Sequence, residues 1–481
     1  MIFSCKTKLS GSIKALLIIF GFLISGIVLS LGDERPNFVV ILCDDLGYGD
    51  ISCYGNKIIK TPNIDRLASQ GIRFTDYYSP SPVCSPSRVG LLTGRTPNRA
   101  GVYDWIPSGT KTHMKKNELT IPAMLKTAGY ATCMSGKWHC NGFFNRKEQP
   151  QPGDFGFDYW FATQNNAAPS HENPRNFVRN GKEVGKLKGF SCRIVAQEAG
   201  KWIESHVKKN PDQPFFTFVA FHEPHEPISS PKSMIENYPR AKKKGEALYY
   251  ANVENMDYAV GMIMKCLKEN DVDENTLVIF TSDNGPETLN RYGGAWRSHG
   301  SPGVLRGMKL HTHEAGIRVP GVMRWPLQIK AGQVSREPVG SLDLMPTFAN
   351  LAAGEIPIEI ELDGTDIVNA FGKDEVIRKK PMFWCYYSAL NRSKIALRQG
   401  DWKLLASLKS NDGKYLKIKS VNDKNINVLK KVKLVDFELY NIAKDRGELI
   451  NLASKNTRQL EGLSKEMESI FNEVLESSIV R

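Results

Sequence analysis

Residues 37–45 have the sequence NFVVILCDD, a continuous apolar run that ends in two acidic residues. No polar side chain interrupts the run between Phe38 and Cys43. A short apolar run of this kind is typical of a strand that is buried on both faces, as in a parallel sheet. We therefore predict that residues 38–43 form a central strand covered by helices on both sides.

Similar runs recur later in the chain, and helical patterns separate them. The expected strands are residues 130–134, 215–221 and 277–281, and the expected helices include residues 63–70, 86–93 and 247–269. This alternation predicts an α/β fold with a large, mostly parallel sheet sandwiched by helices. We assign this α/β domain to residues 33–374.

The pattern changes in the last quarter of the chain. Residues 394–405 and 432–440 indicate antiparallel strands, and a final helix follows them. The helix is marked by apolar residues at helical spacing, namely Leu460, Leu463, Met467, Ile470, Phe471 and Val474. We predict a smaller C-terminal α+β subdomain at residues 375–481, with these apolar side chains in its core.

The first thirty-two residues have the features of an export signal. Lys6, Lys8 and Lys14 precede an apolar run at residues 15–31, and small residues surround the expected cleavage position. The alternative is a membrane anchor, for which the run is near the lower length limit. We predict a cleaved signal peptide at residues 1–32, a periplasmic or secreted protein, and no stable membrane anchor after cleavage.

Polar clusters directly follow four of the expected strands. They are Asp44-Asp45, residues 137–139, residues 222–225, and Asp283-Asn284. Ligands collect at the carboxyl ends of parallel strands, so one site is expected to gather all four clusters. Asp44, Asp45, Asp283 and Asn284 offer only oxygen ligands, which calcium or magnesium prefers. The alternative is that an aspartate merely caps the segment that follows it. Capping often explains a single aspartate, but it rarely explains two separate acidic pairs.

Residues 84–88 have the sequence CSPSR, and LLTGR follows at residues 91–95. Cys84 precedes an expected helix whose free N–H groups favour an anion, and Arg88 lies one turn into that helix. An ordinary thiol at this position is expected to be acidified and reactive. The alternative is a buried structural cysteine in front of a capped helix.

This motif resembles the signature of the type I, formylglycine-dependent sulfatases of the alkaline phosphatase-like superfamily, in the group of arylsulfatase A and N-acetylgalactosamine-6-sulfatase. Further blocks typical of the family appear in order and span nearly the whole mature chain. They are residues 44–47, 136–139, 222–224 and 282–285, then Lys309 with residues 314–320. Ala315 stands where many relatives have glycine, and this small departure does not weaken the resemblance.

The resemblance implies that a formylglycine-generating enzyme oxidises Cys84 to formylglycine (3-oxoalanine), which is then hydrated. One hydroxyl attacks sulfur to give a covalent sulfo-enzyme, and the second hydroxyl releases sulfate. One calcium per chain would be held by Asp44, Asp45, Asp283, Asn284 and residue 84.

The resemblance also implies roles for other residues. Arg88 would hold the nucleophile or the anion, and His139 would orient the formylglycine. Lys137 and Lys309 would contact the sulfate. His222 or Lys309 would protonate the leaving oxygen.

Two other functions remain as alternatives. Phosphate and phosphonate hydrolases share the expected fold, but they generally have histidine after the aspartate at position 283, where imidazole suits transition metals. Asn284 suits calcium instead. A catalytically silent glycan-binding relative would be expected to lack Cys84 or an acidic ligand, and this chain keeps them all.

The expected substrate is a sulfated carbohydrate. The formal charge of +13 falls to +10 without the three lysines of the signal, and a basic protein attracts polyanions. Such a charge would attract nucleic acid too, but we predict no nucleic-acid partner. Many of the lysines lie at residues 403–433, and this stretch is as readily explained by a solvent-exposed surface as by a binding surface for polyanions. Trp105 is a candidate stacking platform, and polar residues 160–177 are candidates for sugar contacts. The predicted substrate-binding residues are Trp105, His171, Arg175 and His225.

Nine cysteines show no CxxC pair and no dense framework. Neither a zinc site nor a disulfide scaffold is therefore indicated.

Overall fold

The computed structural model describes residue 1 and residues 35–372, 375–416, 418–422 and 424–479. Apart from Met1, the predicted signal peptide lies outside these residues. Within these ranges, no helix has both the length and the apolar character needed to cross a bilayer.

The central strand β1 (Asn37–Asp44) lies between β7 (Phe215–Pro224) and β8 (Thr276–Ser282) and runs parallel to both. β3 (Ala131–Lys137) continues the parallel arrangement on the far side of β7. The large sheet has the strand order β10-β2-β9-β8-β1-β7-β3-β4-β5-β6, with β11 paired to β2. The prediction of a large, mostly parallel sheet is confirmed.

The remaining strands complete this sheet at its two ends. They are β2 (Ile72–Tyr78), β4 (Tyr159–Thr163), β5 (Val178–Arg179), β6 (Lys182–Glu183), β9 (Arg318–Arg324), β10 (Gln333–Ser335) and β11 (Val339–Gly340). β9 is antiparallel to β8 and β2, and β5 is antiparallel to β4 and β6.

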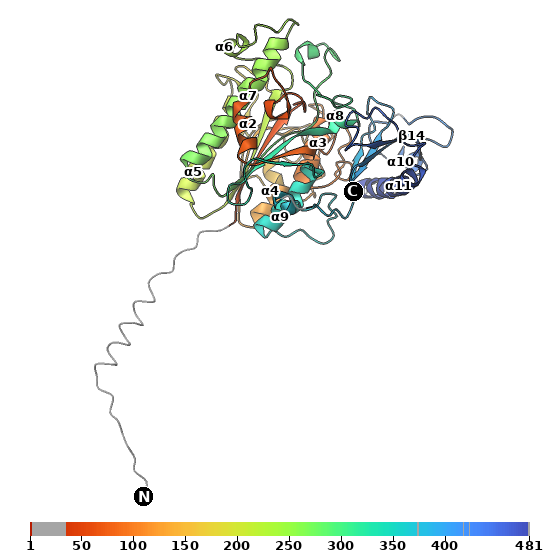
Figure 1. The fold of residues 1–481 in the computed structure, drawn as a ribbon. Coiled ribbons are helices and arrows are strands. Elements are labelled where there is room, and N and C mark those ends of the chain that lie inside the picture. The colour runs from red at the N-terminus through yellow and green to blue at the C-terminus, as the bar shows by residue number, and fades with distance from the viewer. Residues whose placement is uncertain (2–34, 373–374, 417, 423, 480–481) are drawn as a thin grey trace, which may run out of the picture. The chain divides into compact units, whose positions relative to one another are not determined.

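Helices cover both faces of the sheet (Figure 1). One face carries α2 (Pro62–Ser69), α5 (Ser191–Lys209) and α7 (Glu246–Glu269); the other carries α3 (Cys84–Thr93), α4 (Ile121–Thr127) and α9 (Leu344–Ala352).

Side chains of β1 alternate between the two cores. Phe38, Val40 and Leu42 pack on the α3 side, and Val39 and Ile41 pack on the α7 side. Each such burial stabilises the fold by about 1.5–3 kcal/mol, so the uninterrupted apolar run specifies a strand with two buried faces.

Helix α3 ends where the sequence predicts, since Gly94 adopts the left-handed conformation with φ 66° directly after Thr93. It begins two residues earlier than expected, at Cys84, because the extended Val83 already acts as the N-cap. Cys84 is therefore the first residue of the helix and not a residue in front of it.

The C-terminal part contains an antiparallel sheet of β12 (Met382–Cys385), β13 (Ile395–Gln399), β14 (Trp402–Lys409) and β15 (Lys433–Asn441). The predicted single strand at residues 394–405 is instead the hairpin β13–β14, which turns at Gly400 with φ 55°. Helix α11 (Thr457–Ile479) packs on this sheet through the predicted apolar residues. Residues 35–481 form one compact unit, and the boundary at residue 375 stays a prediction.

A buried ion cluster joins the two sheets. Arg318 pairs with Asp76 and, at 2.9 Å, with Glu314 of the short helix α8 (Glu314–Ile317). Two cations from the C-terminal sheet complete the cluster: Arg398 lies 2.6 Å from Asp76, and Lys403 lies 2.8 Å from Glu314. Because a buried charge without a partner costs several kcal/mol, these pairs hold the C-terminal sheet against the α/β domain.

Candidate active site

Four neighbouring strands end at one edge of the sheet, and a polar cluster follows each of them. The strand order β8-β1-β7-β3 brings together Asp283, Asp44 and Asp45, His225, and Lys137. The expected convergence of the four clusters is therefore present in the structure.

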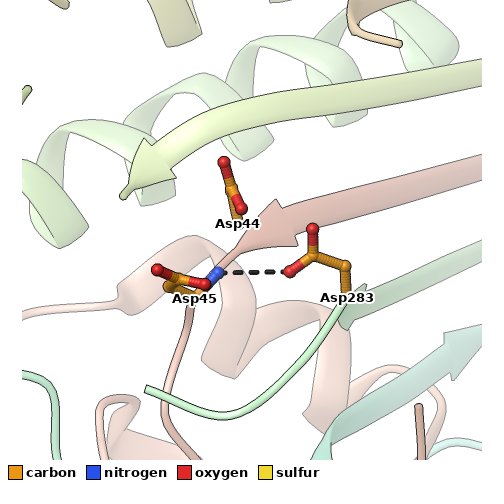
Figure 2. A group of neighbouring side chains, drawn as sticks. All are labelled: Asp44, Asp45 and Asp283. Atoms are coloured by element: carbon orange, nitrogen blue, oxygen red, sulfur yellow. Dashed lines mark hydrogen bonds between the residues drawn. The ribbon is translucent and has the colours of Figure 1, made fainter. Parts of the chain in front are cut away.

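Three carboxylates form the centre of this site. Asp44 is the last residue of β1, Asp45 follows it and Asp283 follows β8, and one oxygen from each lies within 4.8 Å of the others (Figure 2). Asp45 has φ 66°, a left-handed conformation that turns its side chain back toward the cluster, where its amide donates to Asp283 Oδ1. Asn284 Nδ2 donates to Asp45 Oδ1 at 2.7 Å.

Two oxygens in this cluster are buried without a hydrogen-bond partner in the described part of the chain. They are Asp44 Oδ1 and Asn284 Oδ1. Buried polar atoms are normally satisfied, so such oxygens next to three carboxylates are suited to act as ligands of a cation. The set of carboxylate and amide oxygens fits calcium, as the sequence predicts.

Buried cations surround the carboxylates. Lys137 Nζ donates to Asp44 at 2.6 Å, and Lys309 Nζ lies 2.7 Å from Asp45 Oδ1. Arg88 Nε donates to Asp283 Oδ2 at 2.9 Å. This positive shell makes the site attractive to a small anion.

The charges shift the pKa values of the acids in different directions. Burial raises the pKa of Asp283 to about 7, and the neighbouring charge of Asp44 adds to this effect. Burial also acts on Asp44, but the charges of Lys137 and Arg88 outweigh it and hold its pKa well below the usual range. Asp44 is therefore the most firmly ionised member of the cluster, which suits a metal ligand.

Cys84 is buried at the N-terminus of α3, beside the positive shell. The expectation that an ordinary thiol is acidified here is wrong. Burial raises the pKa of the Cys84 thiol to about 11, and Lys137 and Lys309 offset only part of this effect. The desolvation of a thiolate in a closed site exceeds its attraction to two lysines that already pair with aspartates.

A cavity of about 500 Å³ opens above these residues, and we call it the catalytic cavity. Cys84, His139, His225 and Lys309 line its base. The other lining residues are Val83, Asp104, Trp105, Asn165, Asn166, Arg291, Tyr292, Leu310, Tyr386, Ser388 and Lys419. The Cys84 side chain, two imidazoles and an ammonium group thus share one space of the size that ligand sites have.

The two histidines of the segment His222–His225 lie in different surroundings. His225 lines the catalytic cavity, with Nε2 at 3.6 Å from Asp45 Oδ2. His222 is fully buried below it, and its Nε2 shares a 2.8 Å hydrogen bond with Thr163 Oγ1. Of the two histidines, only His225 lines the catalytic cavity, whereas His222, the predicted catalytic residue, lies behind it.

Two predicted substrate-binding residues do not line the catalytic cavity. His171 is fully buried, where it accepts a 3.2 Å hydrogen bond from Asn252 and lies 3.6 Å from Glu223. Arg175 is exposed and lines a different cavity together with Gln164. Trp105 does line the catalytic cavity, and 49% of its surface is exposed.

Several lining residues were missed in the sequence. Tyr386 and Ser388 come from the C-terminal part and donate to the two oxygens of Asp104 at 2.9 and 2.8 Å. Asn165 and Asn166 each have a buried side-chain oxygen without a partner in the described residues. The asparagines stand in the polar segment 160–177 that the sequence singles out, whereas nothing in the sequence marks Tyr386 or Ser388.

Comparisons with known proteins agree with this site. The family profile described as Sulfatase matches residues 36–355, and the profile described as N-sulphoglucosamine sulphohydrolase, C-terminal, matches residues 308–422. Arylsulfatase A from Homo sapiens is 35% identical over 392 residues, which cover 76% of this chain and 74% of that protein.

A second relative and a solved structure extend the likeness. N-acetylgalactosamine-6-sulfatase from Rattus norvegicus is 31% identical, covering 78% of this chain and 72% of that protein. The crystal structure of Ps i-CgsB in complex with k-i-k-neocarrahexaose matches with a TM-score of 0.74 at 27% identity, covering 93% of this chain and 98% of that chain. The chain therefore belongs to the sulfatase family and is a sulfuric ester hydrolase.

Proposed function

We propose that this sulfatase releases sulfate from a sulfated carbohydrate, using residue 84 after its conversion to formylglycine and one calcium held by Asp44, Asp45, Asp283 and Asn284. The observation that carries the proposal is the position of Cys84. It is the first residue of a helix, and it lines one cavity together with His139, His225 and Lys309, beside the acidic cluster.

The hydrated aldehyde at residue 84 and a calcium ion at the acidic cluster would supply complementary chemistry. A hydrated aldehyde at residue 84 supplies a nucleophilic hydroxyl and a second hydroxyl through which sulfate leaves. Bound calcium lowers the pKa of the attacking hydroxyl and offsets the charge of the sulfate. The partnerless oxygens of Asp44 and Asn284 support the calcium site.

The positive residues of the chain would bind and orient the ester. Lys137 pairs with Asp44, and Lys309 pairs with Asp45. Both ammonium groups would therefore lie beside the sulfate group of an ester bound next to the acidic cluster. Arg88 fastens α3 to Asp283 and keeps residue 84 near that position. The first turn of α3 adds free N–H groups directed at the anion.

We assign protonation of the leaving oxygen to Lys309. Although burial lowers the pKa of Lys309, the neighbouring Asp45 outweighs it and keeps the ammonium group protonated. Burial lowers the pKa of His225 to about 3, so this imidazole is neutral at pH 7. Its Nδ1 lies 2.6 Å from the carbonyl of Glu226, which places the proton on Nδ1 and leaves Nε2 as an acceptor. His225 would therefore help to position the substrate by accepting a hydrogen bond, and would not donate a proton to the leaving oxygen.

A carbohydrate is the substrate that the cavity walls favour. Trp105 offers a half-exposed ring, and Asn165 and Asn166 offer buried carbonyl oxygens that hydroxyl or amide groups of a sugar could satisfy. One of the relatives is named for N-acetylgalactosamine, and the matching structure holds a neocarrahexaose. A phosphate or phosphonate ester is the second candidate, and Asn284 argues against it because a two-metal site would favour histidine there.

We further propose that residues 1–32 export the enzyme to the periplasm or the medium and that a formylglycine-generating enzyme acts on it first. Both points rest on the sequence: the lysine-rich apolar leader and the motif at residues 84–88.

The test is coexpression of the full chain with a formylglycine-generating enzyme, followed by two measurements. Mass spectrometry of the peptide that contains residue 84 should show formylglycine in place of cysteine. The matured enzyme should release sulfate from at least one member of a panel of sulfated mono- and disaccharides faster than from nitrophenyl sulfate. Full activity with unmodified cysteine would contradict the nucleophile, and preference for the aryl ester would contradict the carbohydrate.

A further inference from the structure

A second cavity, of about 830 Å³, lies outside the catalytic cavity and shares none of its lining residues. Its walls come from the 3-10 helix η1 (Ser52–Tyr54), from β2 and β10, and from the segment around Arg446. Four cations line it, namely Lys57, Arg73, Arg336 and Arg446. We call it the arginine cavity.

Acidic residues are missing from the described lining of the arginine cavity. Four other cavities of this protein, including the catalytic one, each have at least one aspartate or glutamate in their walls, for example Asp273 beside Arg324 and Glu183 near Arg175. A cleft whose walls carry charges of one sign focuses its field and concentrates counter-ions. The arginine cavity therefore differs from these four in having cationic side chains and no acidic one in its described walls.

The three arginines also have no ion pair in the part of the chain that the structure describes. Arg73 is held in place by an aromatic ring, since its guanidinium lies 5.2 Å from the centroid of Tyr54. Tyr48 packs edge-on against Tyr54, with 4.8 Å between the ring centroids. The guanidinium of Arg73, which contacts a ring and pairs with no described carboxylate, keeps its donors available for a ligand, and no described carboxylate pairs with Arg336 or Arg446 either.

Apolar side chains lie beside these charges. Ile58, Val304 and Val334 line the same cavity with 59%, 72% and 52% of their surfaces exposed. A ligand with anionic groups on an otherwise weakly polar body would cover both kinds of wall. Sulfated pyranose rings have this character, because their sulfates are anionic and their C–H faces are apolar.

We propose that the arginine cavity is a second binding site for a sulfated oligosaccharide, separate from the site of hydrolysis. This inference rests on the proposed function, which makes a sulfated glycan the molecule that the enzyme meets. Arginine binds sulfate-like oxyanions through two parallel hydrogen bonds, so several guanidinium groups around one cavity suit a chain with several sulfates. Binding there would raise the effective concentration of a polymeric substrate without changing the chemical step.

The two cavities are close along the chain. Tyr48 of the arginine cavity is three residues after the proposed calcium ligand Asp45, which limits the separation of their Cα atoms to about 11 Å. The loop between them is fixed, because Gly47 N donates to Asp50 at 2.7 Å and Ser301 N donates to the same carboxylate at 2.8 Å. Short substrates need only the catalytic cavity, whereas longer ones gain from the second.

The experiment compares two triple variants with the same loss of charge. One carries Arg73→Gln, Arg336→Gln and Arg446→Gln; the control carries Lys208→Gln, Lys209→Gln and Lys243→Gln, three exposed lysines elsewhere. Calorimetry in the inactive Cys84→Ala background measures binding of hexasaccharides from chondroitin sulfate, heparin and κ-carrageenan. The arginine variant should bind the preferred hexasaccharide on the order of tenfold more weakly than the control. In the active background, kcat/KM for nitrophenyl sulfate should be equal in the two variants.

Equal hexasaccharide affinities in the two variants would overturn the inference, since only net charge would then matter. Polyglutamate binding to the parent as tightly as the hexasaccharides would also overturn it, in favour of a site for acidic protein segments. Failure of the proposed function is a separate result: the matured enzyme would desulfate none of the saccharides, whatever the arginine variant binds.

Discussion

Arg88 Nε donates to Oδ2 of Asp283 at 2.9 Å, and both side chains are fully buried. Arg88 stands four residues after Cys84 on the same helix, whereas Asp283 follows β8. The bond therefore fixes the position of the nucleophile relative to the acidic cluster. A change at either end should disturb both the metal and the reaction.

Asp283→Asn and Asn284→Ala should each lower bound calcium and activity together, because each change removes or weakens an oxygen ligand. Elemental analysis of the purified enzyme and assays with added calcium measure the two effects. Asp212→Asn, which changes an exposed aspartate, serves as the control. Two transition metals per chain in the parent enzyme would favour the phosphonate hydrolase alternative.

Cys84→Ser should take up one sulfate from the substrate and then turn over very slowly. A serine side chain has one hydroxyl on its carbon, so the sulfate ester that it forms lacks the second hydroxyl needed for release. A burst of about one product per enzyme, together with a mass increase on the peptide containing residue 84, is the expected result. Steady turnover near the parent rate would show that release does not depend on the second hydroxyl.

Lys309→Ala should lose more activity on a sugar sulfate than on nitrophenyl sulfate, because only the sugar alcohol needs a proton as it leaves. The extra loss should be about 10²–10⁴-fold. His225→Ala should lower both activities by similar factors if it only orients the ester. The reverse pattern in the two variants would transfer the role of proton donor to His225.

Trp105→Ala and Asn165→Ala should lower kcat/KM for the sugar sulfate and leave nitrophenyl sulfate nearly unchanged. Both residues line the catalytic cavity, where contacts with the sugar contribute binding energy at the reacting centre. Arg175→Ala is the matched control, because Arg175 lines another cavity. An equal effect of all three changes on the sugar substrate would place the sugar elsewhere.

Asp257→Asn should alter how stability depends on pH. Burial raises the pKa of Asp257 from 3.8 to about 6, although its carboxylate accepts hydrogen bonds from the N–H groups of Asn63 and Ile64. Because the folded state binds the proton more tightly, Asp257 contributes to the free energy of unfolding. This stabilisation is fully present below pH 4 and is lost as pH rises through 6. It amounts to at most about 3 kcal/mol.

Urea unfolding of the parent and of Asp257→Asn between pH 4 and 7 measures this contribution. The difference in unfolding free energy between the two proteins should change with pH over this range. A difference that stays constant would mean that Asp257 titrates normally.

The core of this fold could be predicted because β1 is encoded by an apolar run with no interruption, and burial on two faces leaves few other structures for such a segment. The site could be predicted in outline for a related reason. Asp44-Asp45 and Asp283-Asn284 stand directly after buried strands, and parallel strands end at a common edge.

Other features depend on tertiary packing that a local pattern does not encode. His222 lies within β7 and His225 directly follows it, and only the three-dimensional path of the chain places His225 in the cavity and His222 behind it. The pKa of Cys84 depends on how completely its surroundings close over it. Tyr386 and Ser388 reach the cavity from the C-terminal part because of their hydrogen bonds to Asp104, a contact across almost three hundred positions of sequence.

The ion cluster between the two sheets sets a condition for anyone who exchanges parts of this enzyme. Arg398 and Lys403 belong to the C-terminal sheet, yet they neutralise Asp76 and Glu314 of the α/β domain. A chimera that takes its C-terminal sheet from another sulfatase, in order to import new specificity, would have to keep both cations. Without them, two buried acids would lose partners, and one of them, Glu314, is five residues from Lys309. The graft would then damage the reaction centre that it was meant to retarget.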